Sequence, residues 1–187
     1  MAIAEPEIRT TREDFVRMVE AGVFRDRRVE LVDGVVYEMT PQLSPHASAI
    51  RRSRRALQAV FSPEEYEVDA QLPLDLSGRD MPEPDLAVVP REATDYYASH
   101  PTGAVLVVEV ADTSLSHDRK RKGRMYAEAG VEDYWILNLA QDVLEVYRNP
   151  TEGDYRTRRI LRRGEQIAPL ARPDALIAVD DLLPLKL

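Results

Sequence analysis

The chain has 187 residues, of which 44% are hydrophobic and 31% charged, as expected for a folded domain with a sizeable core. It contains no cysteine, which excludes disulfides and cysteine zinc sites, and no apolar run is long enough to span a bilayer. A net charge of −8 disfavours a protein that coats nucleic acid non-specifically, but it does not exclude an enzyme that cuts nucleic acid.

The residue pattern in the first half of the chain predicts both helices and strands. They are a helix over 11–22, a hairpin over 28–39 turning at Asp33-Gly34, a basic amphipathic helix over 45–61 and a strand over 66–76. The first helix has clear boundaries, because Thr11 and Asp14 resemble a capping box and Gly22 is a typical C-cap.

The apolar runs in the second half of the chain predict most strands of a β-sheet. We expect a buried strand over 86–89, a loop or short helix over 91–102, a central strand over 105–111, a helix from Ser114 or Ser116 to Gly130, strands over 133–139 and 143–148, and another strand with a small β appendage after Tyr155. The pattern favours a mixed sheet flanked by helices, in one α/β domain over 1–187.

Glu109 is the most informative residue, because it interrupts the apolar run 104–111. An ionised carboxylate in a buried strand is costly unless it is paired or binds a metal. Asp85 heads a second apolar run, 86–89. Two strand-borne carboxylates and a nearby inward lysine predict a metal-dependent site that cleaves phosphodiesters.

Lys122 is the candidate for that lysine. It shares one helical face with Met125, Tyr126 and Ala129. Met125 and Tyr126 have the character of core residues, so Lys122 is expected to point towards the sheet and Glu109.

Phosphodiester cleavage needs an activated water and neutralisation of charge on the phosphate. Mg²⁺ or Mn²⁺ supplies both and prefers oxygen ligands, here Asp85, Glu109 and a backbone carbonyl near Val110. Lys122 would orient or acidify the water and stabilise charge. Glu30, also on an apolar stretch, would bind a second metal or hold a metal-bound water.

Basic and polar residues are candidates for contact with the substrate. His46, Arg51 and Arg52 belong to the basic helix, and Gln71 to the adjacent predicted strand. The alternatives are a capping or surface role for His46, a solvated face for the arginines, and ordinary strand polarity for Gln71.

The acidic residues also have structural interpretations. Glu109 and Lys122 could form a purely structural ion pair, Asp85 could begin a turn, and Glu30 could face solvent. Tyr126 and Trp135 are expected in the core.

The arrangement resembles the PD-(D/E)XK nuclease superfamily, and more narrowly the Uma-type restriction-endonuclease family. The resemblance covers nearly the whole chain and rests on Arg28–Gly34, Pro84–Val89, Val107–Val110, Asp118-Arg119 with Lys122 and Tyr126-Ala127, and Gly130–Ile136. The superfamily lysine stands two residues after the glutamate, where this chain has Ala111. The Uma-type pattern instead has the lysine four residues before a tyrosine, as Lys122 precedes Tyr126.

The resemblance implies a restriction-endonuclease-like fold, Mg²⁺ dependence, DNA as substrate, a 5′-phosphate product and a homodimer. Asp85→Ala, Glu109→Ala and Lys122→Ala are each expected to remove cleavage and leave the fold intact. A catalytically silent member of the fold, serving as a nucleic-acid-binding or assembly module, is the alternative. A glycosidase is disfavoured because aromatics are only 6% of residues. The start of the chain lacks signal-peptide features, so the cytoplasm is the expected location.

Overall fold

The computed structural model describes residues 8–92 and 95–185. Residues 1–7, on which the signal-peptide expectation rests, lie outside this part, as do residues 93–94 of the predicted loop over 91–102. In the described part, no helix combines the length and apolarity needed to cross a membrane.

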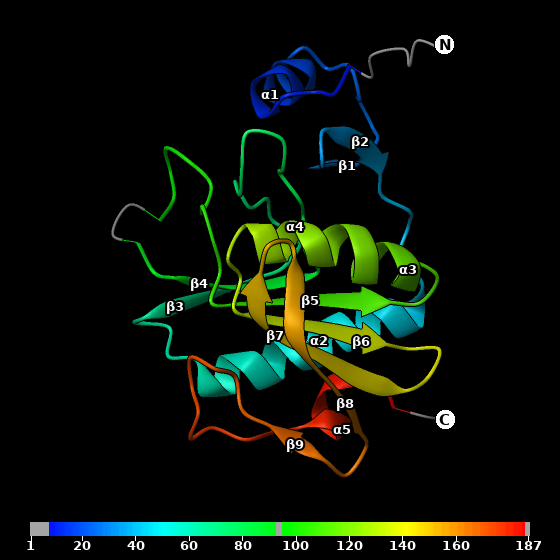
Figure 1. Cartoon of the computed structure of the whole chain (residues 1–187), viewed down its shortest axis with the longest axis vertical. Helices are drawn as coiled ribbons and strands as arrows, with labels where there is room; N and C mark the ends of the chain where they lie inside the picture. The colour runs from blue at the N-terminus through cyan, green and yellow to red at the C-terminus, as the bar shows by residue number, and fades with distance from the viewer. Residues whose placement is uncertain (1–7, 93–94, 186–187) are drawn as a thin grey trace.

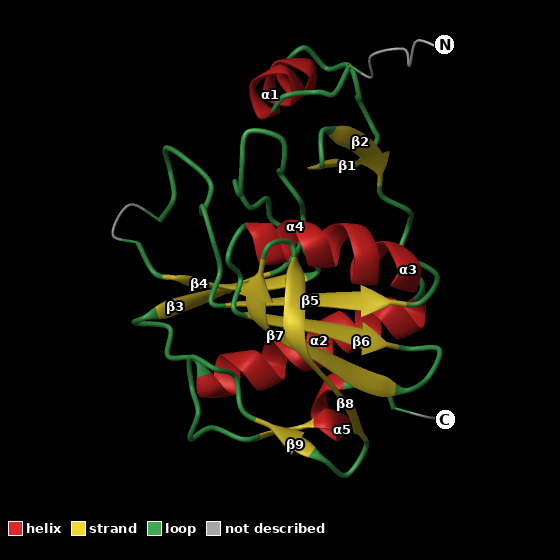
Figure 2. Cartoon of the chain, viewed as in Figure 1, coloured by secondary structure: helices red, strands yellow, loops and turns green. Residues whose placement is uncertain are grey.

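A six-stranded mixed sheet forms the middle layer of the molecule (Figure 1, Figure 2). Its order is β3-β4-β5-β6-β7-β8, with β5 and β6 parallel and all other neighbours antiparallel. The strands are β3 (Tyr66–Asp69), β4 (Leu86–Pro90), β5 (Leu106–Ala111), β6 (Asp133–Asn138), β7 (Val143–Thr151) and β8 (Asp154–Arg162). The predicted mixed sheet is therefore confirmed.

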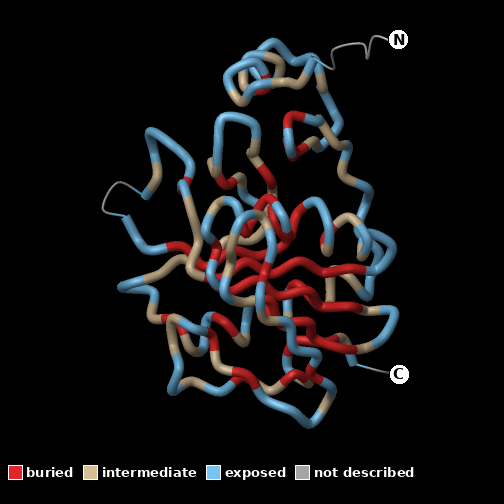
Figure 3. Tube along the Cα trace, viewed as in Figure 1, coloured by how far each residue is buried: buried red, intermediate tan, exposed pale blue. Residues whose placement is uncertain are grey.

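Helices cover both faces of this sheet (Figure 1). One face packs on α2 (Ser44–Val60), and the other on α3 (Leu115–His117), the π-helical segment η1 (Asp118–Lys122) and α4 (Gly123–Glu128). Side chains alternate along β5, so Val108 and Val110 join the core under α2, whereas Val107 joins the core under α4. Glu109 is two residues from Val107, so its side chain lies on the same face of the sheet and points towards η1 and α4. Figure 3 shows the most continuous burial along these central strands.

Smaller elements complete the described fold. They are α1 (Arg12–Glu20), the hairpin β1 (Val29–Val32) and β2 (Val35–Glu38), the pair β9 (Gln166–Ile167) and β10 (Ile177–Ala178), and α5 (Val179–Leu182). The Thr11 side chain caps α1 by accepting from the backbone N–H of Asp14. Asp33 and Gly34 both have positive φ, as a tight two-residue hairpin turn requires.

Three expectations about these elements need correction. The strand predicted over 66–76 ends at Asp69, because Gln71 takes a left-handed φ of 56° and Pro73 cannot donate to a ladder. The helix predicted up to Gly130 is interrupted by η1, where the Gly123 N–H bonds to the Asp118 carbonyl five residues back. The tail also contains α5, which was not predicted.

Candidate active site

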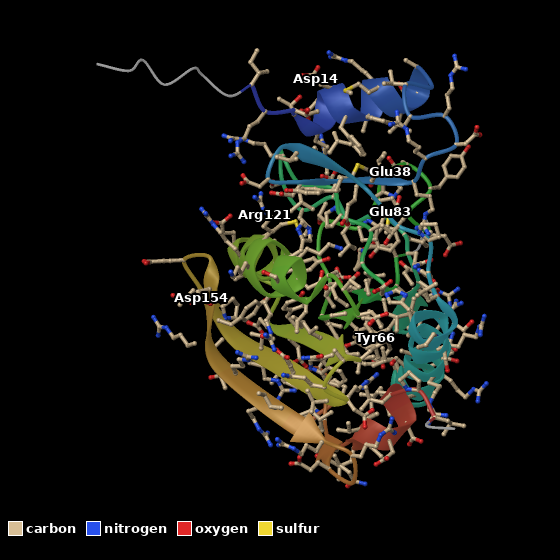
Figure 4. All side chains as sticks on the ribbon, turned by 90° about the vertical axis from the view of Figure 1, so that its right-hand side faces the viewer. Asp14, Glu38, Tyr66, Glu83, Arg121 and Asp154 are labelled. Carbon is tan, nitrogen blue, oxygen red and sulfur yellow. The ribbon has the colours of Figure 1, made fainter. Side chains whose placement is uncertain are left out.

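A cavity of about 290 Å³ lies where β5 ends, bordered by the hairpin, the start of α2 and the α3–η1 segment. Figure 4 views the molecule from this side, with Glu38 and Glu83 of the lining labelled and Arg121 on the neighbouring helix. The lining includes the predicted residues Glu30, His46, Asp85, Glu109, Val110 and Lys122. A larger, more apolar cavity of about 490 Å³ lies beside α1, and Asp85, Glu109 and Lys122 do not line it.

The three predicted carboxylates come from three different strands or their ends. Glu109 lies within β5, Asp85 directly precedes β4, and Glu30 lies in β1. Each is buried, with at most 7% of the residue exposed. Asp85 is held against β5, because its Oδ2 accepts the backbone N–H of Val110 at 2.8 Å. The antiparallel pairing of β4 with β5 therefore brings the two acidic positions together.

Lys122 lies between two of these carboxylates. Its Nζ is 3.0 Å from Glu109 Oε1 and 3.0 Å from Glu30 Oε2. Tyr126, one helical turn later, donates its hydroxyl to the same Glu109 oxygen at 2.8 Å. Burial lowers the pKa of Lys122, but the charges of Glu109 and Glu30 outweigh it and raise that pKa, so the ammonium stays charged.

Asp118 is a buried acid of this cavity that was not predicted as a site residue. It is 3% exposed, lines the cavity and accepts a hydrogen bond from Ser114 Oγ. Burial raises its pKa to about 6, despite the nearby charge of Lys122. The available signal was its spacing, since Asp118 precedes Lys122 by four residues and so belongs to the same helical face.

Negative charge is in excess in this cavity. Glu30, Asp85, Glu109 and Asp118 are all buried, and the described lining offers one lysine and two histidines against them. Burial raises the pKa of Glu109 to about 8; Lys122 opposes this shift, and the neighbouring carboxylates add to it. Because four acidic side chains are buried in one cavity, added positive charge is favoured there, whether protons or a cation.

The other predicted substrate contacts divide into two groups. His46 Nε2 lies 3.1 Å from Asp85 Oδ2, and Gln71 donates to Asp85 Oδ1 at 3.3 Å, so both reach the site. Arg51 and Arg52 do not line the cavity. Arg52 instead donates to the main-chain carbonyl of Asp180 in α5.

Oxygen donors suited to a hard cation belong to three residues that line the cavity. They are the carboxyl groups of Asp85 and Glu109 and the main-chain carbonyl of Val110, which lies 2.8 Å from His46 Nε2. Among residues 8–92 and 95–185, no group of three or more His, Asp or Glu side chains is arranged to hold a metal ion. A cation here would therefore depend on the carbonyl and on water for further ligands, which is common for Mg²⁺. The donor chemistry and the excess buried negative charge fit Mg²⁺ or Mn²⁺.

Tyr126→Phe tests how strongly the site depends on its supporting hydrogen bonds. The change removes one of the two donors to Glu109 Oε1 and leaves a buried carboxylate oxygen less satisfied. We expect the free energy of unfolding in urea to fall by about 1–3 kcal/mol. Tyr97→Phe is the control, because Tyr97 is 96% exposed and its replacement should change nothing. Equal stability of the two variants would show that the Tyr126 hydroxyl does not support Glu109.

The sheet and its flanking helices define a restriction-endonuclease-like nuclease fold. The structure is similar to the crystal structure of a "putative nuclease belonging to DUF820" from Anabaena variabilis, with a TM-score of 0.71 and 13% identity over 92% of this chain and 96% of that one. The type IIG restriction endonuclease BpuSI matches with a TM-score of 0.40 and 15% identity, over 59% of this chain and 12% of that one. No curated protein matches the sequence. The model of the Uma2 family, described as "Putative restriction endonuclease", matches residues 12–180, and the chain belongs to this family.

Proposed function

We propose that this protein is a metal-dependent DNA endonuclease that hydrolyses phosphodiester bonds at the site of Asp85, Glu109 and Lys122. The observation that carries the proposal is the excess of buried carboxylates around one lysine in a single open cavity. Such an arrangement is costly in a folded protein unless a cation uses it. Membership of the Uma2 family supports nuclease chemistry, and DNA is the substrate that its description implies.

Asp85, Glu109 and the carbonyl of Val110 would hold Mg²⁺ or Mn²⁺. When bound, the cation would supply positive charge to the phosphate and acidity to a water. Glu30 would hold a water near the phosphate, or a second cation. Gln71 donates a hydrogen bond to Oδ1 of Asp85, which helps to hold the carboxylate in one orientation.

The ammonium of Lys122 has three N–H donors, and two of them face Glu109 and Glu30. The third is left for a water or a phosphate oxygen at the cavity. Because both carboxylates keep Lys122 protonated, it acts as a donor and a positive charge rather than as a general base. It would orient the attacking water and stabilise charge that develops on the phosphate.

Asp85→Asn is the variant that tests this function most directly. Calorimetric titration with Mg²⁺ and Mn²⁺, followed by a plasmid-nicking assay on the same samples, should show metal binding and metal-dependent nicking by the wild type. Asp85→Asn should lose both, with nicking reduced at least about 100-fold. The control is Asp112→Asn, an exposed acid just beyond β5 that does not line this cavity.

The outcomes separate the proposed endonuclease from a catalytically silent nucleic-acid-binding or assembly module. Metal binding without nicking, while DNA is still bound, would favour the module. Wild-type protein that binds no metal even with DNA present would end the metal-dependent proposal. Sedimentation of the same samples tests the homodimer that we propose with this function.

A further inference from the structure

His46 belongs to the first turn of α2, the helix that begins at Ser44 beside the cavity. Its Nε2 lies 2.8 Å from the main-chain oxygen of Val110 and 3.1 Å from Oδ2 of Asp85. Asp85 and Val110 are two of the three groups proposed to hold the cation. A single ring nitrogen therefore contacts both of these oxygens at hydrogen-bond distance.

The chemistry of these two partners fixes the state of that nitrogen. A carbonyl oxygen and a carboxylate oxygen only accept hydrogen bonds, so Nε2 must carry a proton and donate. It has no lone pair available for a metal in this arrangement. The other ring nitrogen, Nδ1, is buried and has no hydrogen-bond partner among the described residues.

The Asp85 oxygen that His46 contacts, Oδ2, has a second hydrogen-bond donor. Oδ2 also accepts the Val110 N–H at 2.8 Å, so two nitrogen atoms lie within 3.1 Å of this one oxygen. Oδ1 is less occupied, since its partner Gln71 is 3.3 Å away. A cation that binds Asp85 through Oδ2 therefore competes with the imidazole for this oxygen.

We propose that His46 is a displaceable stand-in for the cation: its Nε2–H binds the Asp85 and Val110 oxygens that the cation would take, and it withdraws when the cation binds. This inference rests on the proposed function. It gives His46 a role distinct from metal ligand, general base or helix cap. The imidazole keeps Asp85 paired and oriented, and in doing so it competes with the metal and weakens its binding.

Two substitutions at His46 separate competition from ligation. His46→Ala removes the competing donor and should bind Mn²⁺ and Mg²⁺ about tenfold more tightly than wild type in calorimetric titration, as expected for loss of one hydrogen bond to a charged group. His46→Gln keeps an amide N–H donor on a side chain of similar reach, and should bind with nearly wild-type affinity. His100→Ala, at an exposed histidine outside this cavity, is the control.

A spectroscopic measurement gives a readout that does not depend on affinity or activity. In ¹⁵N-labelled protein, the Nε2–H signal of His46 is assigned by its absence from His46→Ala. Adding diamagnetic Mg²⁺ should shift or broaden that signal as the ring leaves Asp85, and should leave the His100 signal in place. Folding of each variant is checked by circular dichroism before titration.

Each result has a defined meaning. Weaker binding by His46→Ala would make His46 a ligand and overturn the proposal. Unchanged binding, together with an unmoved imidazole signal, would mean that the cation uses Asp85 Oδ1 or another position, and would also overturn it. If neither wild type nor His46→Ala binds either metal, the proposed metal-dependent function fails together with this inference. In the two preceding outcomes wild type binds metal, so the inference fails alone.

Discussion

Lys122→Met should remove cleavage and also lower the free energy of unfolding by about 3–5 kcal/mol at pH 9, above the raised pKa of Glu109. Methionine fills a similar volume, so the loss comes from charge rather than from a cavity. Without the ammonium, Glu109 and Glu30 face each other inside the protein with no cation between them. From the sequence alone, the fold was expected to tolerate loss of this lysine. Because Lys122 is only 5% exposed, we now expect its loss to destabilise the fold.

A double variant distinguishes the catalytic from the structural role of Lys122. Lys122→Met with Glu109→Gln removes one positive and one negative group of the buried pair. Much of the lost free energy of unfolding in urea should therefore return, while nicking stays absent. Lys120→Met, which changes an exposed lysine two residues away, should match wild type in both assays. If Lys122→Met cleaves plasmid normally, Lys122 has no part in catalysis. If it is also fully stable, the buried ion pairs carry little energy.

The sequence predicted the parts of the site that depend on strand and helix periodicity. Glu109 stood out because a charged residue interrupts a buried strand, and Lys122 because Met125 and Tyr126 fix the face of its helix. Both features follow from local spacing along the chain. The structure brings these two residues within 3.0 Å of each other.

The parts that were missed depend on tertiary contacts. The π-helical turn is signalled only by Gly123 within the predicted helix, and a Cβ there would lie 3.3 Å from the Asp118 carbonyl oxygen. Arg52 was placed with the substrate because its helix is basic, yet its guanidinium contacts α5, an element absent from the prediction. No spacing rule gives the approach of the α2 N-terminus to β5, which brings His46 to Asp85.

Stability without divalent cations should be highest near pH 4–5 and should fall as the pH rises towards 8. The pKa of Asp118 is raised by burial from an ordinary 3.8 to about 6, and that of Glu109 from 4.5 to about 8. Between the ordinary and raised values, the folded protein binds more protons than the unfolded chain. Stability contributed by these protons is therefore present at low pH and lost as the pH rises through the folded values.

Glu145 sets the acid side of this profile. It is fully buried and accepts hydrogen bonds from Arg119, Asn138 and Tyr147. Burial would raise its pKa, but these donors and the charge of Arg158 outweigh burial and lower the pKa to about 2. This group has the opposite sign, so its stabilising contribution is present above pH 4.5 and is lost as the pH falls towards 2.

Thermal unfolding in EDTA from pH 3 to pH 9 measures both sides of the profile. Asp118→Asn should flatten the decline between pH 4 and 6, and Glu109→Gln the decline between pH 4.5 and 8, because each removes one buried ionisation. Asp112→Asn, an exposed change, should leave the profile as it is. A melting temperature that rises steadily from pH 4 to pH 8 would show that these carboxylates ionise without cost. The excess of buried negative charge would then no longer argue for a cation site.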